Sequence, residues 1–238
     1  LAINMEANTS RVEEALVACD EAAEASLAER AAGVEERNDD SPQDLHRILD
    51  WHASEACGMY VRAGQLTEKY MRGGLAKEMA EGYYKKALDD VPHGGEDVDK
   101  LKAVAANNYG SLIWGKERMA EAEAMFRTAL ELNVDYISAL RNLALVLRSP
   151  GKGTKNDLEE AQELLGQAVK VTKENFAEEG ELDSWSVDDA SPTRMKSMKE
   201  GWKQEHDRDS ERSMASLVRS DLAAVKLELG DEDYAGIE

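Results

Sequence analysis

The sequence has few aromatic residues, few prolines and no long apolar run. Aromatic residues make up 5% of the 238 residues, and there are four prolines. Aromatic and β-branched residues favour strands, whereas the abundant Ala, Leu, Glu and Lys favour helices, so we expect an all-α chain. No apolar run approaches the roughly 18–20 residues that a membrane-spanning helix needs, and we therefore expect no membrane span.

Positive charge is also scarce. The net charge is −20, and all but one of these charges come from three acidic segments, residues 1–40, 174–190 and 230–238. No basic stripe is present that could displace the counterions of phosphate groups, which argues against nucleic-acid binding. The acidic flanks have two interpretations: they attract a basic partner, or they only keep the helices soluble.

Signatures of catalysis and of metal binding are missing too. The two cysteines have no nucleophile motif around them, and "SPGKGTKN" lacks the spacing of a phosphate-binding loop. His46, Asp50 and His52 lie close together in "LHRILDWH", but a metal site needs three or four convergent ligands. We therefore predict no catalytic residues, no metal and no cofactor. An enzyme that uses His46 and Asp50 is the remote alternative.

Two long helices are expected at the start of the chain. Ser10 can cap the first, which runs to about Arg37. In "SPQD", Ser41 and Pro42 begin the second, which should end near Gly64. The expected apolar face of the first helix consists of Val12, Leu16, Cys19, Ala23, Leu27, Ala31 and Val34.

If these two helices form an antiparallel hairpin, the numbers of facing residues sum to about 79. Cys19 then lies opposite Tyr60, within one turn of Cys57. A chain of this size does not need a disulfide to fold, so we expect two buried thiols that are close but not bonded. This pattern favours a reducing intracellular compartment, either the cytoplasm or an organelle.

Further along the chain, helices are expected in pairs. After a break at Gly73-Gly74, we expect helices over about 75–90, 99–115, 118–132, 135–148 and 156–177. Residues 174–190 form an acidic linker. Residues 191–238 should hold a helix that Ser191 caps, followed by an acidic tail. The apolar stripe that should seal the last hairpin consists of Met214, Leu217, Leu222, Val225 and Leu229.

Small residues recur at fixed positions in these pairs, as close crossings between helices require. In the second helices, Ala122-x3-Phe126-x2-Ala129 matches Ala161-x3-Leu165-x2-Ala168 and Ala80-x3-Tyr84-x2-Ala87. In the first helices, Ala106-x2-Tyr109-Gly110-x2-Ile113 aligns with Leu140-x2-Leu143-Ala144-x2-Leu147. Ala122, Ala129 and Ala161 should therefore be almost fully buried.

These residues resemble the tetratricopeptide repeat (TPR) family, with long repeats similar to the kinesin-light-chain type. The resemblance implies a right-handed superhelix, an α-solenoid, of about three helical hairpins within residues 41–173. An acidic N-terminal helix within residues 1–40 and a capping helix within residues 191–238 would flank these repeats.

Two asparagines occupy equivalent places in this pattern. Asn108 and Asn142 lie 34 residues apart, and each stands two residues before a small crossing residue. In the tetratricopeptide repeat family, which these residues resemble, this position faces the concave groove and holds the backbone of a bound peptide. A carboxamide suits this task because it both donates and accepts hydrogen bonds. Alternatively, the two asparagines are only solvated or cap neighbouring hairpins.

The resemblance thus implies a non-catalytic protein–protein interaction module, acting as an adaptor or as a structural subunit of a larger assembly. Its partner would be a protein or peptide. The predicted partner-binding residues are Asn108, Ser111, Trp114, Ser138, Arg141, Asn142 and Arg148. The alternative is a co-chaperone-like clamp, in which Arg141 and Arg148 grip the C-terminal carboxylate of a partner.

Overall fold

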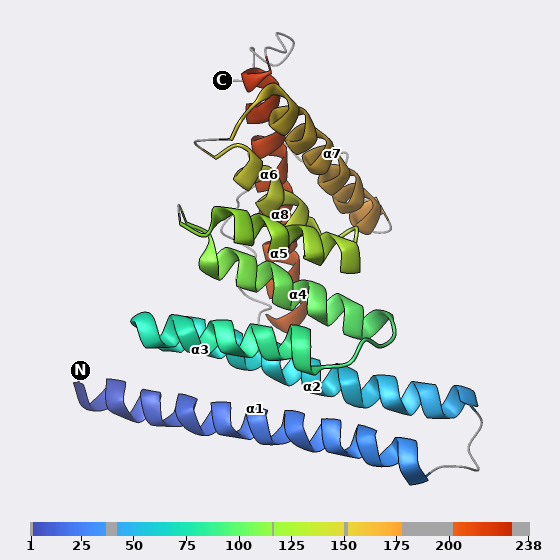
Figure 1. Ribbon diagram of the computed structural model, residues 1–238. Coiled ribbons are helices and arrows are strands. Elements are labelled where there is room, and N and C mark those ends of the chain that lie inside the picture. Colours follow the sequence, from blue (N-terminus) through green and yellow to red (C-terminus); the bar gives the residue numbers. More distant parts are fainter. Residues whose placement is uncertain (1, 37–41, 116, 150–151, 178–201, 230–238) are drawn as a thin grey trace. The chain divides into compact units, whose positions relative to one another are not determined.

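The structure is a computed structural model that describes residues 2–36, 42–115, 117–149, 152–177 and 202–229. This part of the chain is helical and contains no strand, which confirms the predicted all-α class. The helices form two compact units, Leu1–Val134 and Asp135–Glu238. Figure 1 shows the helices of both units.

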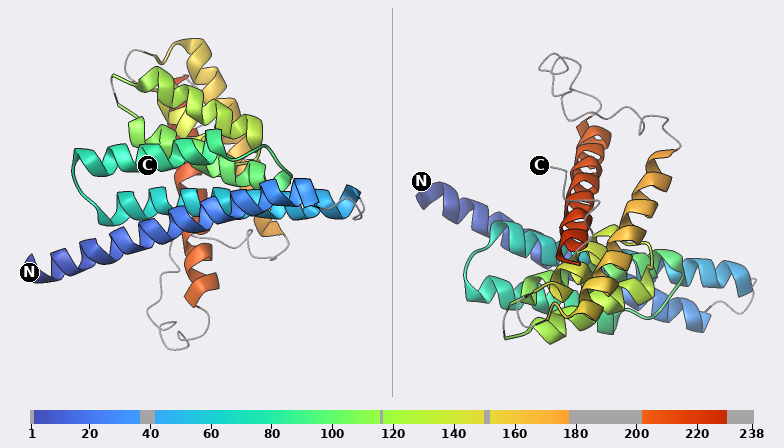
Figure 2. Two further views of the ribbon diagram at one scale, coloured as in Figure 1. Left: turned by 60° about the horizontal axis from the view of Figure 1, so that its bottom comes forward. Right: turned by 90° about the horizontal axis from the view of Figure 1, so that it is seen from above.

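The first unit is a series of helices in which neighbours along the chain pack on one another. α1 and α2 lie side by side along most of their length, and α2 also packs against α3 and α4 (Figures 1 and 2). The α2–α3 and α4–α5 pairs form two helical hairpins. The bounds are α1 Ala2–Glu36, α2 Pro42–Tyr70, α3 Gly74–Lys85, the π-helical turn η1 Lys86–Asp90, α4 Glu96–Ile113 and α5 Met119–Leu132.

The first helix is longer than the sequence predicted. It begins at Ala2, so the prediction that Ser10 caps it is wrong. Good helix formers such as Ala2, Met5 and Glu6 precede Ser10, and no breaker separates them from it. The predicted pairing with α2 is confirmed, because Arg30 Nε donates a hydrogen bond to the carbonyl oxygen of Leu49 at 3.2 Å, and these residue numbers sum to 79.

The second helix is also longer than predicted, because Gly64 does not end it. α2 continues to Tyr70, and the chain breaks at Gly73, whose φ of 94° favours glycine. Gly64 is buried where α2 meets the ring of Tyr84, and a Cβ atom at position 64 would lie 2.5 Å from Tyr84 Cε1. Glycine stands here to allow a close helix crossing, and not to stop the helix.

The α4–α5 hairpin repeats this crossing. A Cβ atom at Gly110 of α4 would lie 2.8 Å from Phe126 Cε1 of α5, and Phe126 is fully buried. Ala122 and Ala129, on either side of Phe126, have no exposed surface, and neither has Ala161 in the second unit. The predicted burial of the three alanines is therefore confirmed.

The π-helical turn η1 is supported by two side chains from other helices. η1 ends this helical segment at Asp90, and the last carbonyl groups of a helix have no donor within the helix, so they need other partners. Cys57 Sγ lies 3.9 Å from the carbonyl oxygen of Ala87, and Lys102 Nζ donates to that of Leu88 at 2.9 Å. Lys102 is only 2% exposed, and both Cys57 and Cys19 are buried, free cysteines.

The second unit contains three helices, α6 Ile137–Leu147, α7 Lys155–Ala177 and α8 Trp202–Glu228. α7 packs against α6 as the predicted hairpin partner, and α8 packs against α7. Thr154 begins α7 with a reciprocal cap. Its backbone N–H donates to Asp157 Oδ2 at 2.9 Å, and the N–H of Asp157 donates to Thr154 Oγ1 at 3.2 Å.

The apolar stripe of α8 differs from the predicted one. Val225 is fully buried as expected, but Leu217 is 43% exposed, and Ala215 and Val218 are buried instead. The sequence offers apolar side chains on several faces of this segment, and packing against α7 selects the face that holds Val218 and Val225. The predicted cap Ser191 and most of the acidic linker lie outside the described residues.

Candidate functional site

The seven predicted partner-binding residues fall into two sets, one in each unit. In the first unit they lie on α4, where Asn108 is partly exposed and Ser111 is exposed. Asn108 Oδ1 accepts a hydrogen bond from Asn107 Nδ2 at 3.4 Å. Trp114 is 37% exposed and packs edge-on against Phe126, with ring centroids 6.3 Å apart. This face is therefore polar and accessible, with one aromatic ring fixed at its end.

In the second unit the predicted residues lie on α6 and at its end. Ser138, Arg141, Asn142 and Arg148 are all partly exposed. The opposite side of α6 is apolar, with the buried residues Ala139, Leu140, Leu143, Ala144, Val146 and Leu147. The polar residues thus share a face that α6 does not use for its own apolar core.

Both arginines of α6 hold carboxylates of α8. Arg141 Nε donates to Asp221 Oδ2 at 2.6 Å. Arg148 binds Glu228 with two nitrogens, Nε to Oε2 at 3.2 Å and Nη2 to Oε1 at 2.5 Å. The hydrogen bonds to Glu228 raise the pKa of Arg148 above its usual value. A planar guanidinium is well suited to such two-point contacts with a carboxylate.

The two contacts show in which direction α8 runs relative to α6. In each contact the partner on α8 is 80 residues further along the chain, and the residue numbers rise together from the first contact to the second. α6 and α8 therefore run in the same direction. The arginines are seven residues apart, as are the carboxylates, which corresponds to about two helical turns.

The sequence indicated Arg141 and Arg148 as residues that bind a partner protein, and it did not predict their contacts with α8. It placed Asp221 and Glu228 in a capping helix without a role. The signal that could have found them is the shared spacing of seven residues, Arg141 to Arg148 and Asp221 to Glu228. The sequence alone could not show it to be meaningful, because many other acidic residues have the same spacing.

A second polar cluster, which the sequence did not predict, joins α3, α4 and α5. The Arg118 guanidinium contacts Glu81 at 2.8 Å and Glu121 at 2.7 Å. Tyr109 Oη lies 3.0 Å from Glu81 Oε1 and 2.8 Å from Glu121 Oε1, and Lys85 Nζ donates to Glu81 at 2.8 Å. The hydrogen bonds from Arg118 dominate the shift that lowers the pKa of Glu81 to about 2.

This cluster predicts a loss of stability in acid. Folding lowers the pKa of Glu81 from 4.5 to about 2. The stabilisation of the folded state by this carboxylate is therefore complete above the pKa of the unfolded state, and it is lost as the pH falls through the pKa of the folded state. We expect Glu81→Gln to lower the free energy of unfolding at neutral pH by about 1–2 kcal/mol. This difference from the parent should shrink as the pH falls from about 4.5 to about 2.

Urea unfolding at several pH values measures this effect. The exposed Glu78 on the same helix provides the control, because Glu78→Gln should change stability by less than about 0.5 kcal/mol at every pH. A constant difference between the Glu81→Gln variant and the parent across this pH range would contradict the assignment.

No group of three or more His, Cys, Asp or Glu side chains in the described part of the chain could hold a metal ion. His52 Nδ1 lies 3.5 Å from Glu29 Oε2, and the side chain of His46 lies outside the described ones. Burial raises the pKa of the Cys57 thiol to about 12, which keeps it protonated and unreactive at neutral pH.

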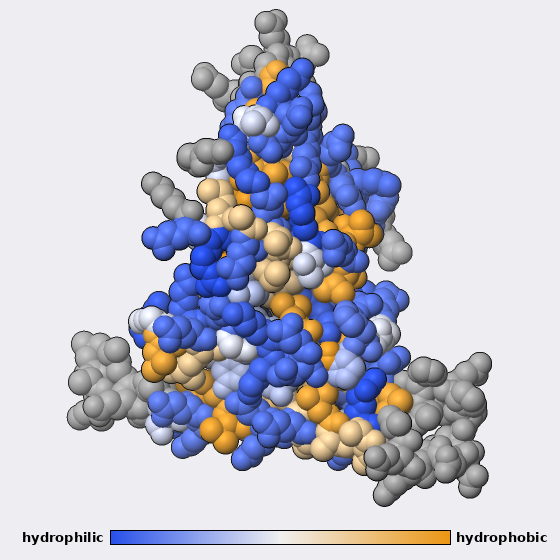
Figure 3. Space-filling model, in the orientation of Figure 1, coloured by the Kyte–Doolittle hydropathy of each residue, from blue (hydrophilic) through white to orange (hydrophobic). Residues whose placement is uncertain are grey.

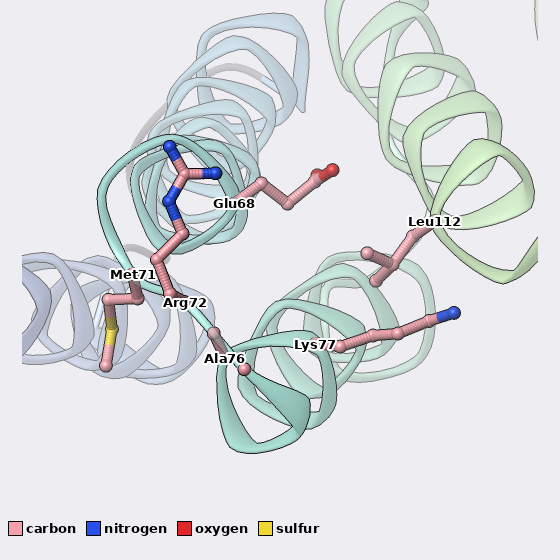
Figure 4. A pocket seen from close by; sticks show the side chains of 7 residues that line it. Glu68, Met71, Arg72, Ala76, Lys77 and Leu112 are labelled. Atoms are coloured by element: carbon pink, nitrogen blue, oxygen red, sulfur yellow. The ribbon is translucent and has the colours of Figure 1, made fainter.

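A small pocket of about 230 Å³ lies in the first unit, where the chain turns from α2 into α3 (Figure 4). Its lining consists of Glu68, Met71, Arg72, Gly73, Ala76, Lys77 and Leu112. The side chains of Arg72 and Lys77 point in different directions in Figure 4 and do not converge on one point. The pocket therefore lacks the convergent polar groups that fix a small ligand.

The surface and the helix lengths add two observations. On the face drawn in Figure 3, hydrophobic residues occur in separate groups among hydrophilic ones. Within the described ranges, no helix is both long enough and apolar enough to cross a membrane.

Comparisons with known proteins give no family assignment. No protein-family model matches this chain, and a search of curated protein sequences finds no significant match.

Proposed function

We propose that this chain is a non-catalytic protein-interaction module built from tetratricopeptide-like helical hairpins, and that it acts as an adaptor or as a structural subunit of a larger assembly. The polar face of α4 in the first unit and the polar face of α6 in the second unit each contact a partner protein. In the resembled family the corresponding faces line a concave groove, and we take this feature from the resemblance.

One observation carries the proposal: the arginines of the predicted partner-binding face of α6 already pair with a helix, α8, which packs on α7. Arg141 and Arg148, which were selected as partner-binding residues, contact the carboxylates of Asp221 and Glu228 on α8. A face whose arginines pair with two carboxylates of a helix of its own chain has the chemistry to bind a protein segment. The contacts are made by side chains on the surface of α6, so they need no change in the hairpin core.

The co-chaperone-like clamp is less well supported by the same contacts. It requires Arg141 and Arg148 to grip the terminal carboxylate of a partner. In this structure both guanidinium groups hold side-chain carboxylates of α8 instead.

The asparagines provide the test of the proposed function. We expect Asn108→Ala with Asn142→Ala to weaken binding of a partner by about 1–3 kcal/mol. Removal of each carboxamide would leave part of the bound peptide backbone without its hydrogen bonds. Partners are captured with the tagged full-length chain and identified by mass spectrometry. The affinity of a purified partner is then measured by titration calorimetry.

The matched control is Asn156→Ala with Asn175→Ala, because both asparagines are exposed on α7 and lie outside the predicted face. The control should bind the partner like the parent. If the Asn108 and Asn142 variant binds like the parent but melts at a lower temperature, these asparagines have a structural role and the proposal fails for them.

A further inference from the structure

α8 carries a recognisable pattern of residues, with which it packs against α7 and pairs with the two arginines at α6. Val218 and Val225 are fully buried, and each is followed three residues later by a carboxylate that binds an arginine, Asp221 or Glu228. The pattern Val-x2-Asp-x3-Val-x2-Glu therefore places two apolar anchors and two carboxylates on one side of the helix, with a period of seven residues.

The charged half of this pattern supplies specificity. A helix that only sealed the hairpin would need an apolar stripe and no matched charges. Here two guanidinium groups on α6 meet two carboxylates at the same spacing, which fixes both the direction and the register of the bound helix. Complementary charges of this kind select a partner and its orientation more than they add affinity.

The apolar half of the pattern is small. The buried residues of the described part of α8 are Ala215, Val218 and Val225, and Leu217 on the same helix is 43% exposed. The ion pairs are partly open to solvent, since the side chains of Arg148 and Glu228 are 18% and 43% exposed. Solvent and salt screen such pairs, so the attachment of α8 is weaker than a core contact between large side chains.

Resting on the proposed function, we infer that the surface of α6 and α7 which α8 covers binds a helix of a partner protein that carries this same pattern, and that α8 occupies this surface until such a helix displaces it. The partner segment runs parallel to α6 and places one carboxylate at Arg141 and another, seven residues later, at Arg148. α8 belongs to the same chain and therefore competes at a high effective concentration. Binding in trans is consequently suppressed while α8 is in place.

A labelled synthetic peptide with the sequence of residues 214–229 serves as the probe. We expect it to bind full-length Asp221→Asn/Glu228→Gln at least tenfold more tightly than the wild-type chain, because the weakened α8 leaves the face open for a larger fraction of the time. Adding Arg141→Gln and Arg148→Gln to this variant should abolish the gain. A peptide with Asn and Gln in place of the two acids should bind no variant better than the wild-type chain.

Ser216→Lys/Ser220→Lys is the matched control, because it changes the net charge by the same amount at exposed positions of α8. It should bind the peptide like the wild-type chain. The single variant Glu228→Gln removes only the more exposed pair and keeps the test valid if the double variant does not fold. Fluorescence anisotropy measures the binding, and circular dichroism confirms the fold of each variant.

Equal peptide affinity for all folded variants would show that α8 is a permanent seal, and the inference would be wrong. A variant that dimerises without binding the peptide would identify a second copy of this chain as the occupant and would also overturn it. Neither result affects the capture experiment when it is made with Asn108→Ala alone, because this variant tests partner binding on α4 in the first unit. The two failures can therefore be told apart.

Discussion

Phe126→Ala should lower the free energy of unfolding by about 3–5 kcal/mol, because it empties a fully buried position of the α4–α5 hairpin. Phe126 has no exposed surface, its ring lies against Gly110, and Trp114 packs edge-on against it. Truncation removes a large apolar side chain, and the helix backbone around it cannot fill the cavity. Urea or thermal unfolding measures the loss.

The neighbouring Arg127 provides the control for this variant. Its side chain is exposed and pairs with Glu123 along one face of α5. Arg127→Ala should therefore cost less than about 1 kcal/mol, as is usual for an exposed ion pair between residues four apart on a helix. If Phe126→Ala unfolds like Arg127→Ala, the described packing of the hairpin is incorrect.

Gly110→Leu should lower the free energy of unfolding by about 2–3 kcal/mol for the opposite reason, which is overpacking. Even a single Cβ atom at this position would lie 2.8 Å from Phe126 Cε1, and the rest of a leucine side chain has no space. The improved helix propensity of leucine over glycine, worth about 1 kcal/mol, offsets only part of this strain. The same unfolding experiment measures it.

Combining the two changes tests whether they act on one contact. In the Phe126→Ala background, the leucine can enter the space that the ring has left, so Gly110→Leu should cost at least about 1 kcal/mol less than in the parent. Gly74 is an exposed control with open space around it. Gly74→Leu should show no such coupling to Phe126→Ala, whereas additive costs for Gly110→Leu would contradict the close crossing.

The helix content and the pairing of the helices could be predicted because local signals agree with the packing. Each of the five helices expected between residues 75 and 177 has a counterpart in the structure, and the burial of Ala122, Ala129 and Ala161 is confirmed. Small residues at helix crossings leave a repeat in the sequence that needs no knowledge of distant contacts. The antiparallel register of α1 on α2 could be predicted from the position of the turn between these two helices alone.

The errors arise where one residue type has two physical uses. Gly64 was taken as the end of a helix, but it lies at a crossing with Tyr84, and the sequence does not distinguish these roles. Ser10 was taken as a cap although helix formers precede it. The acidic partners of Arg141 and Arg148 are 80 residues away in the chain, and only the folded arrangement identifies them among the many carboxylates.

The cluster around Arg118 has a consequence for how the first unit opens. Arg118 stands at the start of α5 but grips Glu81 on α3, while Tyr109 of α4 contacts the same carboxylate. Neither hairpin can fray at this point without breaking hydrogen bonds of the other. Amide hydrogens of α3, α4 and α5 should therefore exchange with solvent as one cooperative block, in contrast to a repeat array whose hairpins open one at a time.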